Sequence, residues 1–281
     1  MATEVAAVLE QAPAKVNLVL WVGPRRDDGL HELCSLVASI DLADTLRFES
    51  VGTEDEVVCP GVEGPNLVHD ALAAFRRAAP GPVPALRVSI EKRIPVAAGL
   101  GGGSADAAAA LRVANRLAGD PLAADALRAL GAGIGSDVPS QVEPRHSLVA
   151  GAGERVEPVD LPPMTMVLVP AAPGLATADV YAEADRIGAI RHRLDEDAVR
   201  ALAERPLAEL ARAMENDLEA PALSLRPELE ATRARLLESG ALAARVSGSG
   251  PTVFGVFEDE SGASAAAAGI PGAIVARTRD A

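Results

Sequence analysis

The chain has 281 residues, which is enough for one large domain or two medium ones. Its formal net charge of -14 argues against nonspecific nucleic-acid binding, which depends on Lys and Arg at phosphates, so we expect no nucleic-acid partner. The N-terminus shows no signal peptide, and no apolar run approaches the roughly 20 residues of a membrane span. We therefore expect a cytoplasmic protein with no membrane partner.

Segments of strand and helix character alternate through the first half of the chain. A helix over 66–79 is predicted from apolar residues at helical spacing, which begin after Pro65 and end before Pro80. The other predicted elements are strands over 16–22, 44–49 and 86–90, a helix from about Ser104 to Leu117, and a shorter helix near 122–130.

The segment 157–163 contains three prolines and is the best candidate for a domain boundary. We predict an N-terminal domain over 1–160 and a C-terminal domain over 161–281. The second half then has α+β character. Its predicted elements are a strand at 166–169, a mostly helical stretch over 178–237 with breaks at Pro206, Pro221 and Pro227, a strand at 253–257, an alanine-rich helix, and a strand at 273–276.

A glycine-rich turn at 95–104 is the most informative segment of the chain. Gly99 and Gly101–Gly103 expose backbone amides, and Ser104 is predicted to cap the alanine-rich helix that follows. Such a turn at a helix N-terminus attracts anions, so we predict a phosphate site. A P-loop needs a Lys after the glycines, and a dinucleotide fingerprint needs a glycine where Ser104 or Asp106 stands. Neither pattern fits, and a flexible linker is the remaining structural alternative.

Four other segments contain residues that could carry chemistry. Each has an ordinary explanation by itself: a solvated lysine, an exposed histidine, an aspartate in a turn, or a tight hairpin. The segments are Ala12-Pro-Ala-Lys15-Val-Asn17, Asp28-Gly-Leu-His31-Glu32, Gly135-Ser-Asp137-Val-Pro139 and Ser247-Gly-Ser-Gly-Pro-Thr252.

Taken in order, with the turn at 94–104 and Asn216-Asp-Leu-Glu219, these segments resemble the GHMP small-molecule kinases over nearly the whole chain. Within that family they are most similar to the members that phosphorylate a cytidine-diphosphate-linked methylerythritol in isoprenoid precursor synthesis. The resemblance implies a two-domain α+β fold, with an N-terminal ribosomal-protein-S5-like α/β domain and a C-terminal ferredoxin-like α+β domain. It also implies ATP and Mg²⁺ as cofactors.

The resemblance further implies a role for each candidate residue. Asp137 is expected to act as base on the substrate hydroxyl, and Lys15 to stabilise the developing negative charge. Ser104 is the expected contact to phosphate or Mg²⁺. The expected substrate-binding residues are Asn17, His31, Thr177 and Tyr181, and Asn66 and Lys92 are expected to flank the adenine. The residues expected to hold the ATP phosphates are Pro95, Val96, Ala97, Ala98, Gly99, Leu100, Gly101, Gly102, Gly103, Ser104 and Ala105.

Two alternatives stay open at this point. Another GHMP kinase would act on a sugar, homoserine or mevalonate, against which His31 and Asn216 argue. A catalytically silent nucleotide-binding relative would have no need to keep both Lys15 and Asp137. We expect a small-molecule substrate and a monomer or weak homodimer.

Overall fold

The computed structural model describes residues 7–51 and 53–279 of the chain. Two compact units are each assembled from several separate segments, whereas the sequence predicts two consecutive domains, 1–160 and 161–281. That boundary stays a prediction. The described parts of the first unit run up to Ala14, over Leu42–Val96 and over Gly101–Pro144, and those of the second run over Lys15–Asp41, Ala97–Leu100 and from Arg145 onward.

Two long paired strands, β1 (Val8–Arg25) and β2 (His31–Ser50), contribute residues to both units. They confirm the strands predicted at 16–22 and 44–49 but are much longer. Most residues from Ala12 to Leu20 are buried whichever way their side chains point. A strand covered on both faces has no alternation of apolar and polar residues. The sequence pattern therefore does not reveal where such a strand begins and ends.

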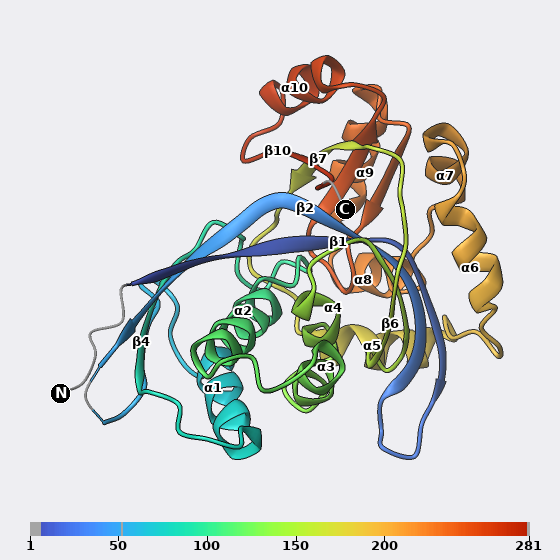
Figure 1. The fold of residues 1–281 in the computed structure, drawn as a ribbon. Helices are drawn as coiled ribbons and strands as arrows, with labels where there is room; N and C mark the ends of the chain where they lie inside the picture. The colour runs from blue at the N-terminus through green and yellow to red at the C-terminus, as the bar shows by residue number, and fades with distance from the viewer. Residues whose placement is uncertain (1–6, 52, 280–281) are drawn as a thin grey trace. The chain divides into compact units, whose positions relative to one another are not determined.

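In the first unit, helices pack on a small sheet (Figure 1). The second half of β2 pairs antiparallel with β4 (Leu86–Glu91), and β4 pairs parallel with β3 (Glu56–Val58). The predicted helices are confirmed, and a short helix after the turn at 133–137 was not predicted. The helices of the described part of this unit are α1 (Leu67–Ala78), α2 (Gly102–Leu117), α3 (Ala124–Ala132) and α4 (Val138–Val142).

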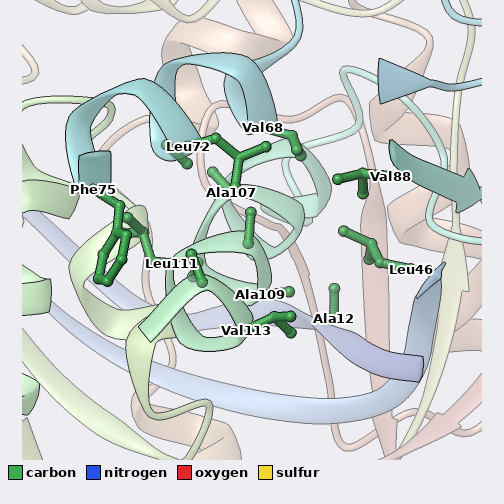
Figure 2. Packing of buried hydrophobic residues seen from close by; sticks show 14 of the residues in the cluster. Ala12, Leu46, Val68, Leu72, Phe75, Val88, Ala107, Ala109, Leu111 and Val113 are labelled. Carbon is green, nitrogen blue, oxygen red and sulfur yellow. The ribbon is translucent and has the colours of Figure 1, made fainter. Parts of the chain in front are cut away.

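The core of the first unit forms around α2, whose alanines are buried along the helix. Figure 2 shows Ala107 and Ala109 of α2 in one cluster with Leu72 of α1, Leu46 of β2 and Val88 of β4. Small side chains let neighbouring elements approach α2 closely, because interaxial distance depends on the side chains at the contact. The alanine run is therefore a packing feature as well as a helix-forming one.

The second unit contains strand pairs at two places. The first half of β2 pairs antiparallel with β5 (Ser147–Gly151), which pairs with β6 (Arg155–Pro158). A separate antiparallel sheet has the order β10-β7-β9-β8, and α9 and α10 contact it. The bounds are β7 (Thr165–Val169), β8 (Ala243–Val246), β9 (Val253–Phe257), β10 (Ile274–Arg277), α9 (Leu229–Glu238) and α10 (Glu260–Ala268).

The predicted helical stretch consists of separate helices, and one predicted break is wrong. Pro206 caps α7 and Pro227 precedes α9, so both interrupt the helical stretch as expected. Pro221 instead lies in the first turn of α8, where a missing amide removes no intrahelical hydrogen bond. The helices are α5 (Thr177–Ile187), α6 (Glu196–Ala203), α7 (Leu207–Ala213) and α8 (Glu219–Leu225).

Across the described residues, no helix combines the length and the apolar character that crossing a membrane requires.

Candidate active site

The glycine turn begins α2 at a different residue from the one predicted. Gly101 is the N-cap, with a left-handed φ of 71°, and α2 starts at Gly102. The expectation that Ser104 caps the helix is therefore wrong, because Ser104 is already the third helical residue. Within the described chain, no side chain caps this helix end by a hydrogen bond. The first amides of α2 thus have the free arrangement that binds anions.

The four residues Ala97–Leu100 belong to the second unit and are held there by the turn between β8 and β9. The Ser247 hydroxyl donates a hydrogen bond to the Gly99 carbonyl at 3.0 Å, and the Thr252 amide donates to the Ala98 carbonyl at 3.3 Å. Gly99 has a φ of 75°, and a Cβ there would lie 2.3 Å from the Ser247 carbonyl oxygen. Only glycine therefore fits this close approach of two turns.

Lys15 is buried beside the same turn, with 4% of its surface exposed. Its backbone amide donates to the Leu100 carbonyl at 3.0 Å, which attaches β1 to the glycine turn. Its ammonium donates to the Asn17 side-chain oxygen at 2.6 Å. A Cβ on Gly248 would lie 3.4 Å from the Lys15 Nζ, so the turn between β8 and β9, which we call the second glycine turn, lies close to this amine.

The amide of Asn17 orients Lys15 because both of its ends are used. Its oxygen accepts from Lys15, and its nitrogen donates to the Ser35 hydroxyl at 2.8 Å. Ser35 in turn donates to the Val19 carbonyl at 2.7 Å. Hydrogen bonds that link buried polar groups in a chain hold its members in one arrangement. Asn17 thus positions the amine of Lys15.

Asn216 ties the second glycine turn to the helical part of the same unit. Its side-chain nitrogen donates to the carbonyls of Val246 and Gly248, at 2.9 and 2.8 Å. Its oxygen accepts from the Leu218 amide at 2.9 Å. The sequence identifies Asn216 only as part of the segment Asn216-Asp-Leu-Glu219, which resembles the GHMP kinases. The structure shows that its side chain holds the second glycine turn in place.

Asp137 lies in the first unit, at the start of α4. Within that unit the turn before it approaches the first turn of α2, since a Cβ on Gly135 would lie 3.9 Å from the Ser104 hydroxyl oxygen. The Ser140 hydroxyl donates to the Asp137 carbonyl at 2.9 Å and closes the turn. Asp137 and Ser104 therefore lie on neighbouring segments, although they are distant in the sequence.

Asn66 and Lys92, the two residues expected near the adenine, both have internal partners in the first unit. Asn66 is the N-cap of α1, and its side-chain oxygen accepts from the Val68 amide at 3.0 Å. The Lys92 ammonium donates to Asp44 and, at 2.8 Å, to Asp106. Burial raises the pKa of the Asp106 carboxyl, and the same carboxylates help raise the pKa of Lys92.

The predicted cytidine-side residues come together in the second unit. The rings of His31 and Tyr181 are 5.3 Å apart between centroids and tilted by 31°. The His31 Nδ1 lies 3.0 Å from the Gly23 carbonyl oxygen, which can only accept, so Nδ1 carries the proton. The Nε2 lies 3.4 Å from an Asp185 carboxylate oxygen.

The hydroxyl of Thr177, the remaining substrate-side candidate, is 3.1 Å from the Ser249 hydroxyl in the second glycine turn.

In the described part of the chain, no group of three or more His, Cys, Asp or Glu side chains could hold a metal ion. Mg²⁺ that travels with a nucleotide needs no such cage, because it keeps several waters and binds phosphate oxygens. One hydroxyl in the first turn of α2, that of Ser104, is compatible with that coordination.

Sequence reasoning missed Ser35, Asp44 and Asp106 as parts of this arrangement. Asp106 carried a signal, because it is the single charged residue in the alanine-rich first turns of the helix. Ser35 and Asp44 carried none, since their partners are distant in the sequence.

Two family models match separate parts of the chain. The GHMP kinases N terminal domain matches residues 66–143, and the GHMP kinases C terminal model matches residues 198–274. The first match contains α1, the start of α2 and Asp137, and the second contains Asn216 and the turn between β8 and β9.

Individual proteins are similar over nearly the full length. The 4-diphosphocytidyl-2-C-methyl-D-erythritol kinase of Anaeromyxobacter dehalogenans is 45% identical over 270 residues, which cover 93% of this chain and 84% of that one. The enzyme of the same name from Bacillus subtilis is 38% identical over 262 residues, covering 90% and 89%. A crystal structure of 4-(cytidine 5'-diphospho)-2C-methyl-D-erythritol kinase superposes with a TM-score of 0.80 at 35% identity, covering 98% of this chain and 100% of that one.

Proposed function

Because the chain belongs to the GHMP kinase family, and within it to the 4-diphosphocytidyl-2-C-methyl-D-erythritol kinases, we propose that it transfers the γ-phosphate of ATP to the 2-hydroxyl of 4-diphosphocytidyl-2-C-methyl-D-erythritol. This reaction is a step of non-mevalonate isoprenoid precursor synthesis. We also propose that the enzyme acts in the cytoplasm as a monomer or weak homodimer.

The observation that carries the proposal is the buried amine of Lys15. Its ammonium is held by Asn17 and lies next to Gly248, while its backbone amide holds Leu100 of the first glycine turn. Phosphoryl transfer depends on positioning and on stabilising negative charge. An ammonium fixed in this way stabilises an oxygen that becomes negative as its proton leaves. We therefore propose this charge-stabilising role for Lys15.

Asp137 has the proposed role of general base. Its carboxylate accepts the proton of the substrate hydroxyl as the oxygen attacks the γ-phosphate. Its place on the turn beside Ser104 supports this role, because Ser104 belongs to the helix end that is proposed to hold the phosphates. Bound Mg²⁺ would neutralise part of the phosphate charge, and Ser104 is the protein oxygen that would contact it.

We propose that the residues 95–105 hold the ATP phosphates through backbone amides, chiefly those at the start of α2. Asn66 and Lys92 remain proposed neighbours of the adenine. Their polar ends are engaged inside the protein, so contact with the base falls to other parts of these residues.

The proposed cytidine site is the paired rings of His31 and Tyr181, with Thr177 beside them. The ring of His31, whose Nδ1 is fixed by the Gly23 carbonyl, is proposed to contact the cytosine. Tyr181 provides an aromatic face for the pyrimidine. Asn17 is proposed to contact the polyol or phosphate end in addition to orienting Lys15.

Turnover of the cytidylyl substrate with ATP, measured beside mevalonate, homoserine and galactose, tests the substrate. Phosphorylation of another acceptor without the first would overturn the proposal. The Asp137→Asn variant tests the mechanism: ATP binding should stay near the wild-type value while turnover falls by roughly 10²–10⁴. Asp125→Asn is the matched control, because it removes a carboxylate with 94% of its side chain exposed from the same unit. Wild-type turnover by Asp137→Asn would exclude the base role.

A further inference from the structure

Lys92, Asp44 and Asp106 form a buried ion cluster in the first unit, which we call the Lys92 cluster. Asp44 is 0% exposed and Asp106 is 3% exposed. Lys92 donates to one oxygen of each carboxylate, at 2.8 Å for Asp106. The other Asp44 oxygen accepts from the amides of Arg93 and Ile94, at 2.6 and 2.9 Å. The cluster thus joins β2, the chain after β4, and α2.

The Lys92 cluster lies directly against the first residue of α2. A Cβ on Gly102 would lie 3.2 Å from the Lys92 Nζ and 3.0 Å from the Ile94 Cγ2. Those distances leave little room for a side chain at position 102, so the Lys92 ammonium and Ile94 lie close to the Gly102 backbone. Asp106 lies in the second turn of the same helix, and its carboxylate accepts a hydrogen bond from the same ammonium. The first turn of α2 is therefore supported by Lys92.

A buried ion cluster is not the most effective way to stabilise this position. It contains one ammonium and two carboxylates, and the Oδ1 of Asp106 finds no hydrogen-bond partner among the described residues. Burying ion pairs is often no better for stability than packing apolar groups of similar volume. The neighbours of Asp106 along α2 are buried alanines. An apolar residue would therefore be the ordinary choice at position 106 as well. The cluster therefore points to a demand beyond folding.

We propose that Asp106 and Asp44 are positioning residues for nucleotide binding, which hold Lys92 against Gly102 so that the first amides of α2 keep the arrangement the ATP phosphates require. This inference rests on the proposed function, since it assigns ATP to that helix end. The two carboxylates act through Lys92 and the backbone. Neither needs to touch the nucleotide.

The Asp106→Ala variant removes the carboxylate that accepts a hydrogen bond from Lys92. Alanine favours helices, so the substitution suits the alanine-rich helix α2. We expect the dissociation constant of ATP, measured by calorimetry, to rise about tenfold, which corresponds to the loss of one charge-assisted hydrogen bond. The KM for ATP should rise in parallel, whereas kcat and the KM for the cytidylyl substrate should change less than about twofold. Asp125→Ala is the control for loss of one negative charge from the same unit.

Two further variants separate positioning from general destabilisation. Asp106→Asn keeps the shape and an oxygen that can accept from Lys92, so it should recover most of the ATP affinity. Asp106→Glu keeps the ion pair but displaces the ammonium from its place beside Gly102, so it should weaken ATP binding severalfold. If Asp106→Ala does not fold, the ATP affinity of Asp106→Glu tests the proposal.

The proposal is overturned if Asp106→Ala or Asp106→Glu binds ATP with wild-type affinity, or if Asp106→Asn binds as weakly as Asp106→Ala. Failure of the proposed function is distinguishable, because it would appear in the wild-type chain. A wild-type protein that binds ATP without phosphorylating the cytidylyl substrate refutes that function and still permits the binding test. A wild-type protein that binds no ATP refutes both.

Discussion

Gly99 and Gly103 are four positions apart in one glycine turn, and the structure predicts opposite consequences when each becomes alanine. At Gly99 the φ of 75° is unfavourable for an L-residue. That conformation costs about 1–2 kcal/mol. The new Cβ would also lie 2.3 Å from the carbonyl oxygen of Ser247 and 2.9 Å from that of Gly250, both of them backbone atoms. Forced repacking of this kind costs about 1–3 kcal/mol.

The Gly99→Ala variant should therefore lose about 2–5 kcal/mol of unfolding free energy. Gly103→Ala is the matched control, because its Cβ would lie 3.8 Å from the Leu67 Cδ1, which is an ordinary contact. Gly103 lies inside α2, where alanine is favoured over glycine by up to about 1 kcal/mol. Its variant should be as stable as the wild type or slightly more so.

Urea unfolding followed by circular dichroism measures both variants. Fluorescence of Trp21, the single tryptophan, reports on the second unit, to which Gly99 also belongs. A wild-type urea midpoint for Gly99→Ala would refute the contact argument. If Gly103→Ala were destabilised as strongly as Gly99→Ala, the turn would be sensitive to any added side chain, and the close approach to Ser247 would not be the cause.

Two further predictions concern buried polar groups of the second unit. Burial lowers the pKa of His146 from 6.5, so the native state binds fewer protons than the unfolded state, and unfolding free energy should fall below about pH 6.5 by up to about 1.4 kcal/mol per pH unit. His146→Asn should flatten that dependence, exposed His192→Asn should not, and an unchanged slope in His146→Asn contradicts the assignment. Asn216→Asp puts a carboxylate oxygen against the carbonyl of Gly248 and should lose about 1–3 kcal/mol in urea unfolding. A wild-type midpoint would contradict that role for the Asn216 amide.

Helix positions were largely predictable because their signals are local. The helix predicted over 66–79 corresponds to α1 (Leu67–Ala78), and Asn66 caps it, as a polar residue before an apolar periodic run should. The start of α2 was not predictable in the same way. Ser104 is a good capping residue by type, but the left-handed conformation of Gly101 starts the helix earlier. Nothing local says which of several glycines adopts that conformation.

The contacts that make the candidate site were beyond prediction from single segments. Ser247 bonds to Gly99 across 148 residues, and Lys92 bonds to Asp44 across 48. Such pairs follow from tertiary packing, and no periodicity in the chain encodes them. Resemblance to a family identified Lys15, Asp137 and His31 as candidates. The structure adds the Asn17 side chain that accepts from Lys15 and the Gly23 carbonyl beside His31.

The glycine turn is held by two separate networks, and the change occurs between Leu100 and Gly101. Up to Leu100 the turn is bound within the second unit, by Lys15 and Ser247. From Gly101 onward it belongs to the first unit and rests on the Lys92 cluster. The first network contains the amine proposed to stabilise charge, and the second supports the amides proposed to bind ATP. Variants of the two networks should therefore differ in kind: those at Asp106 should act on ATP affinity, and those at Asn17 on turnover through Lys15.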